Sequence, residues 1–141
     1  MVWFSVDINY LAVFLAAVAS IIIGGLWYSP VLFGNAWMRA GNMTKDMMEG
    51  AKKKGMAWRY ILAFIGSLLV AYVLSHFIDY AQAVSFTDGM LAGFWVWLGF
   101  IIPVLLGSVL WECKTWTYYM INVLYQLVNL LIIGGILASW A

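Results

Sequence analysis

Four long gaps between charged residues constrain the fold of this chain more than any motif does. Uncharged runs cover residues 8–38, 60–78, 89–111 and 115–141. Each run is long enough to cross a bilayer, because about 20 apolar residues in a helix span a hydrocarbon core of about 30 Å. An open sheet could not satisfy its backbone hydrogen bonds in lipid, so each run is predicted to be a helix.

Composition excludes an ordinary soluble domain. Of the 141 residues, 66% are hydrophobic and 9% are charged, whereas soluble domains are about 25% charged. The first span is expected to end near Tyr28, because Pro30 disfavours helix at Ser29 and lacks a backbone donor. We therefore predict an all-α polytopic membrane protein, a single domain over 1–141 with spans at about 8–28, 58–79, 88–111 and 118–140 and a loop at 29–57.

The distribution of basic residues predicts the orientation. All seven lysines and arginines lie in residues 29–59 and 112–117, while the opposite helix ends carry only Asp7, Asp79 and Asp88. Lys and Arg favour cytoplasmic loops, so both termini are expected to face outward (N-out, C-out). No basic region with a small-residue cleavage site precedes the first span, which is therefore expected to remain in the mature protein.

The 29–57 loop contains the pattern of one short amphipathic helix. Thr44 can cap its first amides, Gly55 can close it in the left-handed conformation, and bases occupy its last turn. These bases form a predicted lipid-facing patch that would attract anionic lipid of the inner leaflet, made of Lys52, Lys53 and Lys54. A docking surface for a cytoplasmic partner and a plain solvated connector remain alternatives.

Small residues recur at four-residue spacing in the first two spans, which favours close helix packing. The two ridges are Ala12, Ala16, Ser20 and Gly24, then Ala63, Ser67, Ala71 and Ser75. They predict that these spans pack on each other or on copies of themselves, and a homo-oligomer is expected. In the third span, Pro103 frees the carbonyl of Gly99 and predicts a kink, either a packing bend or a substrate-lining break.

Polar side chains follow one face of the last span: Asn122, Tyr125, Gln126 and Asn129. An unpaired amide in hydrocarbon costs several kcal/mol, so this polar stripe must meet another helix, another subunit or a wet cavity. The stripe either forms hydrogen bonds between helices or lines a path for a solute or ion.

A second polar group is predicted at the outer end of the second span. Tyr72 and Asp79 lie about one turn to either side of His76. Because histidine titrates near neutral pH, they form a candidate pH-sensitive cluster, although such a histidine also commonly bonds across helices. One histidine does not make a zinc site by itself, though copies in an oligomer could supply one.

Two sequence blocks resemble the DUF1761 family of small bacterial and fungal membrane proteins. The first block is the run GGLWYSPVLFGNAWM at residues 24–38; the second comprises WECK at 111–114, NVLYQLV at 122–128 and Gly134-Gly135. The resemblance implies four spans, a role that is not established, and a bacterial inner membrane as the location. It also selects a candidate cytoplasmic-face site of Trp27, Tyr28, Trp37 and Glu112. Glu112 would form an ion pair with Arg39 or Arg59, or bind a cation or head group.

No familiar catalytic pattern occurs. The acidic residues and the single histidine are too far apart for general acid/base catalysis. No phosphate-binding loop or metal-ligand spacing is present in the sequence. We expect no enzyme activity, no cofactor, no bound metal and no nucleic-acid partner. The first hypothesis is a homo-oligomeric transporter or channel-like protein for a small solute or cation. The second is a non-transporting structural or accessory membrane protein that acts through helix packing and inner-leaflet contacts.

Overall fold

The computed structural model describes residues 6–140, and that part of the chain contains helices and no strand. The elements are α1 (Tyr10–Trp27), α2 (Gly34–Ala40), α3 (Lys45–Lys53), α4 (Ala57–Tyr80), α5 (Phe86–Val96), the π-helical turn η2 (Trp97–Ile101), α6 (Ile102–Leu105), α7 (Gly107–Leu110) and α8 (Trp116–Ser139).

Four helices are long and apolar enough to cross a membrane: α1, α4, the continuous segment Phe86–Leu110, and α8. The all-α prediction is confirmed, and every end of these helices lies within two residues of the bounds expected from the charge gaps. α1 ends at Trp27 with Tyr28 as its C-cap, as the position of Pro30 requires.

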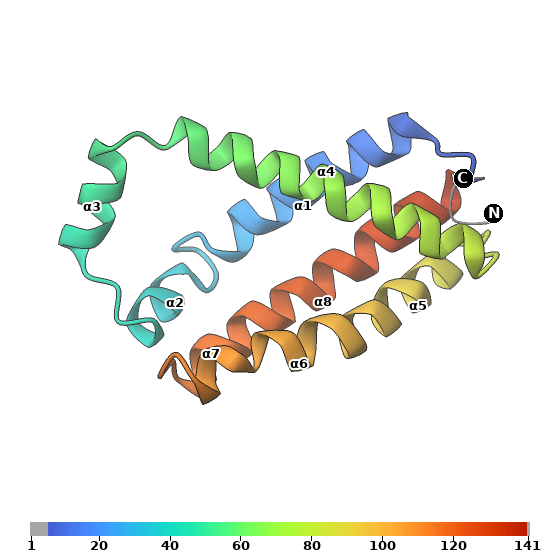
Figure 1. The fold of residues 1–141 in the computed structure, drawn as a ribbon. Coiled ribbons are helices and arrows are strands. Elements are labelled where there is room, and N and C mark those ends of the chain that lie inside the picture. The colour runs from blue at the N-terminus through green and yellow to red at the C-terminus, as the bar shows by residue number, and fades with distance from the viewer. Residues whose placement is uncertain (1–5, 141) are drawn as a thin grey trace.

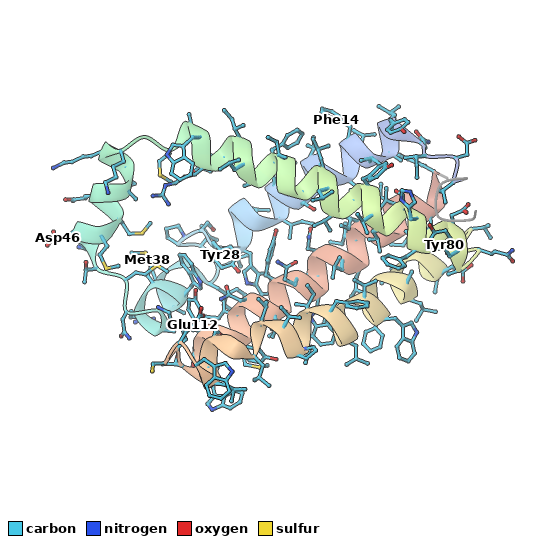
Figure 2. All side chains as sticks on the ribbon, viewed as in Figure 1. Phe14, Tyr28, Met38, Asp46, Tyr80 and Glu112 are labelled. Atoms are coloured by element: carbon cyan, nitrogen blue, oxygen red, sulfur yellow. The ribbon has the colours of Figure 1, made fainter. Side chains whose placement is uncertain are left out.

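The helices run antiparallel in chain order, so the short connections alternate between the two ends of the bundle (Figure 1). The start of α1, the end of α8 and the turn after α4 lie at one end, which we name the terminal end. α2, α3 and the turn before α8 lie at the other, the loop end. Figure 2 labels Asp46 and Glu112 at the loop end and Tyr80 at the terminal end. All seven lysines and arginines belong to segments of the loop end.

The third membrane-length helix is interrupted where Pro103 predicts an irregularity. Residues Trp97–Ile101 form a π-helical turn, and Pro103 follows in the first turn of α6. Proline has no N–H to donate to the preceding turn, so the backbone there rearranges its hydrogen bonds. The predicted break therefore takes the form of a π-helical turn.

α5 and α8 approach so closely that only glycine fits between them. A Cβ atom at Gly89 would overlap the carbonyl oxygen of Gly134, and a Cβ atom at Gly93 would overlap that of Leu130. Such backbone proximity strengthens helix association in lipid. The Gly89–Gly93 spacing is not among the small-residue ridges predicted from the sequence, which lie in α1 and α4.

The core lies between α1, α4 and α8 in the terminal half of the bundle. Ala12, Ala16 and Ser20 of the predicted α1 ridge are buried. On α4 the ridge is only partly covered, because Ala71 is buried whereas Ala63 is exposed. The buried residues of α4 all belong to its second half, so α4 leaves the bundle toward the loop end.

α3 has the caps that the sequence predicts. The Thr44 side chain accepts a hydrogen bond from the Met47 amide at 3.1 Å, and Gly55 adopts a φ of 92° just beyond the helix end. The three residues of the basic patch, Lys52, Lys53 and Lys54, are exposed. Figure 1 shows α3 at the far loop end, apart from the long helices.

Candidate solute-binding cleft

A polar cleft opens between α1, α4 and α8 in the loop half of the bundle. Its volume is about 640 Å³. The cleft exists because α4 diverges from α8 toward the loop end, while α1 remains between them (Figure 1). Its walls include small residues that bring the helix backbones close to the surface, among them Gly24, Gly25 and Gly66.

Hydroxyl and carboxamide groups dominate the polar part of the lining. α4 contributes Tyr60 and Ser67, and the residue after α1 contributes Tyr28. α8 contributes Tyr125, Gln126 and Asn129. None of the described residues that line the cleft is charged. This cavity therefore suits an uncharged polar group, or a cation held by dipoles and aromatic faces, better than it suits an anion.

The polar stripe of α8 faces α1 and the cleft rather than lipid. The Ser20 hydroxyl donates to the Asn129 side-chain oxygen at 2.7 Å, and Asn129 is only 6% exposed. The Tyr125 hydroxyl donates to the Ser20 carbonyl at 3.3 Å. Gly24 permits this approach, because a Cβ atom there would lie 3.1 Å from the Tyr125 hydroxyl oxygen.

Two amide groups of the stripe retain unused hydrogen-bonding capacity. Gln126 makes no hydrogen bond with any residue between 6 and 140, and the Asn129 amide nitrogen donates to none of them. Both side chains line the cleft. A carboxamide inside a membrane-length bundle needs a partner, so these groups are available to water or to a bound molecule.

Aromatic side chains pack around the loop-end mouth of the cleft. The Tyr28 hydroxyl donates to the Asn122 side-chain oxygen at 2.6 Å, and the Trp27 indole donates to the Ile121 carbonyl at 3.0 Å. The Trp37 ring lies edge-on to Tyr28 at 5.1 Å between ring centres. Its buried indole nitrogen lacks an acceptor in the described part of the chain.

The helix that carries Trp37 is held against the start of α8. The Thr115 hydroxyl donates to the Ala40 carbonyl at 3.2 Å, and the Lys114 ammonium donates to the Gly41 carbonyl at 3.2 Å. These bonds satisfy carbonyls at the C-terminal end of α2, which favours cations there. α2 is therefore fixed beside the start of α8.

The predicted cytoplasmic-face site is only partly assembled. The Tyr28 and Trp37 rings are in contact, and Trp27 and Tyr28 both pack against the Tyr125 ring. Glu112, by contrast, is exposed and lines a separate surface cavity beside Trp111. The expected ion pair of Glu112 with Arg39 or Arg59 does not form within the described chain.

The candidate outer cluster also divides. The centres of the His76 and Tyr72 rings are 4.7 Å apart. The Nδ1 atom of His76 lies 2.9 Å from the carbonyl oxygen of Tyr72 on the same helix. His76 lines one surface cavity, while Asp79 lines another. The three residues therefore share a helix end without sharing a cavity.

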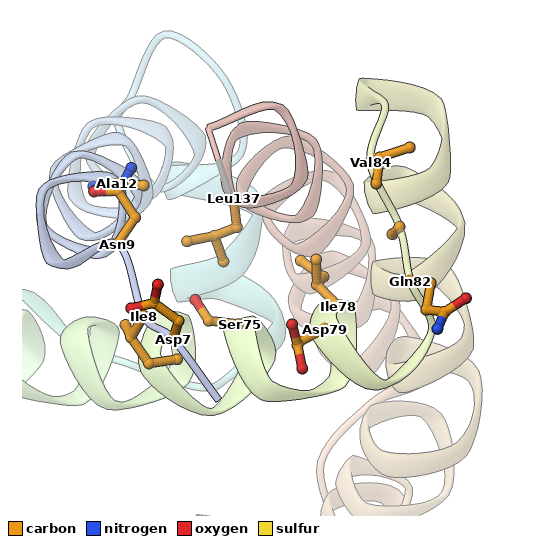
Figure 3. A pocket seen from close by; sticks show the side chains of 11 residues that line it. Asp7, Ile8, Asn9, Ala12, Ser75, Ile78, Asp79, Gln82, Val84 and Leu137 are labelled. Carbon is orange, nitrogen blue, oxygen red and sulfur yellow. The ribbon is translucent and has the colours of Figure 1, made fainter. Parts of the chain in front are cut away.

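The cavity that contains Asp79 lies at the terminal end of the same three helices (Figure 3). Its volume is about 400 Å³, and Asp7, Asn9, Ser75, Asp79 and Gln82 supply its polar lining. Along each helix, apolar side chains separate this acidic cavity from the cleft. The separating residues, 0 to 2% exposed, are Ala16, Ala71, Leu74 and Ile133.

The two polar residues of α4 that line the cleft, Tyr60 and Ser67, were not predicted from the sequence. Ser67 was visible only as part of a packing ridge, and Tyr60 only as one aromatic residue near a helix end. Their role depends on the divergence of α4, which no local pattern encodes. In residues 6–140, no three His, Cys, Asp or Glu side chains gather as a metal site would require.

The comparisons with known proteins identify a family and no activity. No curated protein and no solved structure matches the chain. The model of the family described as "Protein of unknown function (DUF1761)" matches residues 11–138, which include all four long helices and every residue of the cleft. The chain belongs to the DUF1761 family.

Proposed function

We propose that this protein is a membrane transporter or channel-like protein that moves a small solute or cation along the seam between α1, α4 and α8. One observation carries the proposal: a polar, uncharged cleft and an acidic cavity lie on the same three helices at opposite ends, with a closed apolar section between them. This is the arrangement of a path that is accessible at each end and closed in its middle.

The closed section is thin and made of small or branched residues. Ala16 and Ala71 come from the two small-residue ridges, and Ile133 comes from α8. Because α4 is already splayed at the loop end, a rocking motion of α4 against α1 and α8 would open the terminal end and close the cleft. Rigid-body movement of helices around a fixed site is the common mechanism of alternating access.

In this proposal the loop end is cytoplasmic and both termini face outward, because the basic residues gather at the loop end. The acidic cavity would then form the outer entrance, where carboxylates concentrate cations. The protein would also be a homo-oligomer, as the small-residue ridges predict, with an interface away from the lipid-exposed side of α4 that carries Leu62. α3 would rest on the inner leaflet through its three-lysine patch.

Flux through reconstituted vesicles tests the proposal. The panel consists of glycerol, urea, K⁺ and tetramethylammonium, each under an imposed gradient. We expect the unaltered protein to pass at least one of them, and Ser67→Trp to abolish that flux by filling the cleft. The matched control is Leu62→Trp on the same helix, where the side chain is 56% exposed and outside the cleft.

Absence of flux for the whole panel, from protein that is folded and inserted, would refute the proposal. Equal flux from Ser67→Trp and the unaltered protein would place the path elsewhere. The first of these results would favour the structural or accessory role.

A further inference from the structure

We infer that the cleft binds the head of an uncharged amphiphile, whose chain lies in a second, apolar groove on the lipid side of the bundle. The inference rests on the proposed function only in taking the same cleft as the binding site, with this molecule as a bound ligand and not as the transported solute, so its binding can be measured without transport. The structural basis is that the polar cleft and the apolar groove meet at Val70 and Gln126, of which Gln126 is the polar one.

The groove runs between α4 and the segment from α5 to η2, with α8 as its floor. Its volume is about 350 Å³. Apart from Gln126 its lining is apolar, including Val73 and Phe77 of α4, Val96 of α5 and Ile101 of η2. From Val70 to Phe77 it follows two turns of α4, about 10 Å at the rise of an α-helix.

The groove and the cleft are neighbours rather than independent features. Val70 and Gln126 line both of them. A molecule with its polar part beside Asn129 can therefore pass its apolar part over Val70 and into the groove. Ile101 of the π-helical turn forms part of the groove wall, so this turn contributes to the proposed binding site.

Unused hydrogen-bonding groups identify the kind of head group. Asn129 is 94% buried and its amide nitrogen has no acceptor among residues 6–140, while the Gln126 amide has no partner there at all. The two residues lie one helical turn apart and line the same cleft. They can donate to and accept from hydroxyl or amide groups placed between them.

The lack of charge in the cleft excludes most membrane lipids as ligands. A phosphate or carboxylate moved from water into this cavity would lose its hydration without gaining a counter-charge, which is costly. A hydroxyl-bearing or amide-bearing head loses little if each group finds a partner. A monoacylglycerol has the required combination of an uncharged hydroxyl head and one chain.

Photocrosslinking in nanodiscs tests this inference. The nanodiscs contain diphytanoyl phosphatidylcholine, and the probe is a monoacylglycerol with a diazirine in its chain. A phosphatidylglycerol with the same labelled chain serves as the charged comparison. We expect the monoacylglycerol to label peptides of α4 and α5 that line the groove, with competition by unlabelled monoacylglycerol and none by glycerol.

Two variants with one matched control locate the site. Gln126→Leu removes the half-buried amide at the junction and should weaken the apparent affinity about tenfold, as expected for losing one hydrogen bond. Val73→Trp should abolish groove labelling by filling the groove. Leu62→Trp, on the lipid-exposed side of α4 outside both cavities, should label as the unaltered protein does.

Labelling that is spread evenly over all helices, or that is equal in Gln126→Leu, Val73→Trp and the unaltered protein, would overturn the inference. So would equal labelling by the phosphatidylglycerol probe. If vesicle flux occurs without specific labelling, the inference fails and the proposed function stands. If labelling is specific but no cargo moves, the binding site stands and the transport function fails.

Discussion

Replacing Gly93 by alanine tests the close packing of α5 on α8. The new Cβ atom would overlap the Leu130 carbonyl oxygen and lie 2.7 Å from the carbonyl carbon, whereas ordinary contacts begin at 3.4 Å. α5 and α8 would therefore have to separate by at least roughly 0.7 Å at this point. Both obstructing atoms belong to the backbone of α8, so no side-chain rotation can relieve the overlap.

Overpacking of this kind costs about 1–3 kcal/mol. The matched control is Gly66→Ala in α4, where a Cβ atom would meet nothing within 4 Å. Any intrinsic difference between glycine and alanine in a helix is common to both variants. The difference between them therefore isolates the contact with Leu130, and Gly93→Ala should be less stable by about 1–3 kcal/mol.

The assay is unfolding in mixed micelles with a rising fraction of SDS, followed by far-UV circular dichroism and tryptophan fluorescence. Gly93→Ala should unfold at a lower SDS fraction than the unaltered protein, and Gly66→Ala should not. Equal free energies of unfolding for the two variants would refute the packing of α5 on α8 described above.

Two further predictions concern single hydrogen bonds at the loop end. Tyr28→Phe removes the donor that bonds the Asn122 oxygen at 2.6 Å, and should lower the free energy of unfolding in the same assay by about 1 kcal/mol; an unchanged value would contradict the bond. Thr44→Ala removes the cap on the Met47 amide, which costs about 1 kcal/mol of helix stability. Amide hydrogen exchange should accelerate in α3 and not in α8, and uniform acceleration would contradict the independence of α3.

The helix positions were predictable because charge is expensive in hydrocarbon, so its absence marks the spans directly. Pro30 likewise predicted the end of α1, since its effect is local. The caps of α3 at Thr44 and Gly55 were predictable for the same reason, because each depends on a few neighbouring residues.

Contacts between helices were harder to predict, because they depend on how each helix is rotated about its axis. The Gly89 and Gly93 spacing is as regular as the ridge on α1, yet only the facing backbone at Gly134 and Leu130 makes it a close contact. The stripe on α8 was recognised as polar, but its bond to Ser20 required the relative rotation of α1.

The cleft itself could not be predicted from local patterns. It results from the divergence of α4, which exposes Tyr60 while Ala71 on the same helix remains buried. A sequence reports that Ser67 is small and that Gln126 is polar, but not that they line one cavity. Glu112 was predicted to join the cytoplasmic-face site, but the structure places it in a separate surface cavity.

Cysteine accessibility tests the central claim, that the seam between α1, α4 and α8 is a wet path closed in its middle. In a Cys113→Ser background, single cysteines replace Ser67 in the cleft, Ser75 in the acidic cavity and Leu62 on the lipid side of α4. A membrane-impermeant thiol reagent should modify Ser67→Cys only from the loop-end side and Ser75→Cys only from the opposite side, and it should leave Leu62→Cys unmodified. If Ser67→Cys is as unreactive as Leu62→Cys from both sides, the cleft is not a solvent-accessible path and the account is wrong.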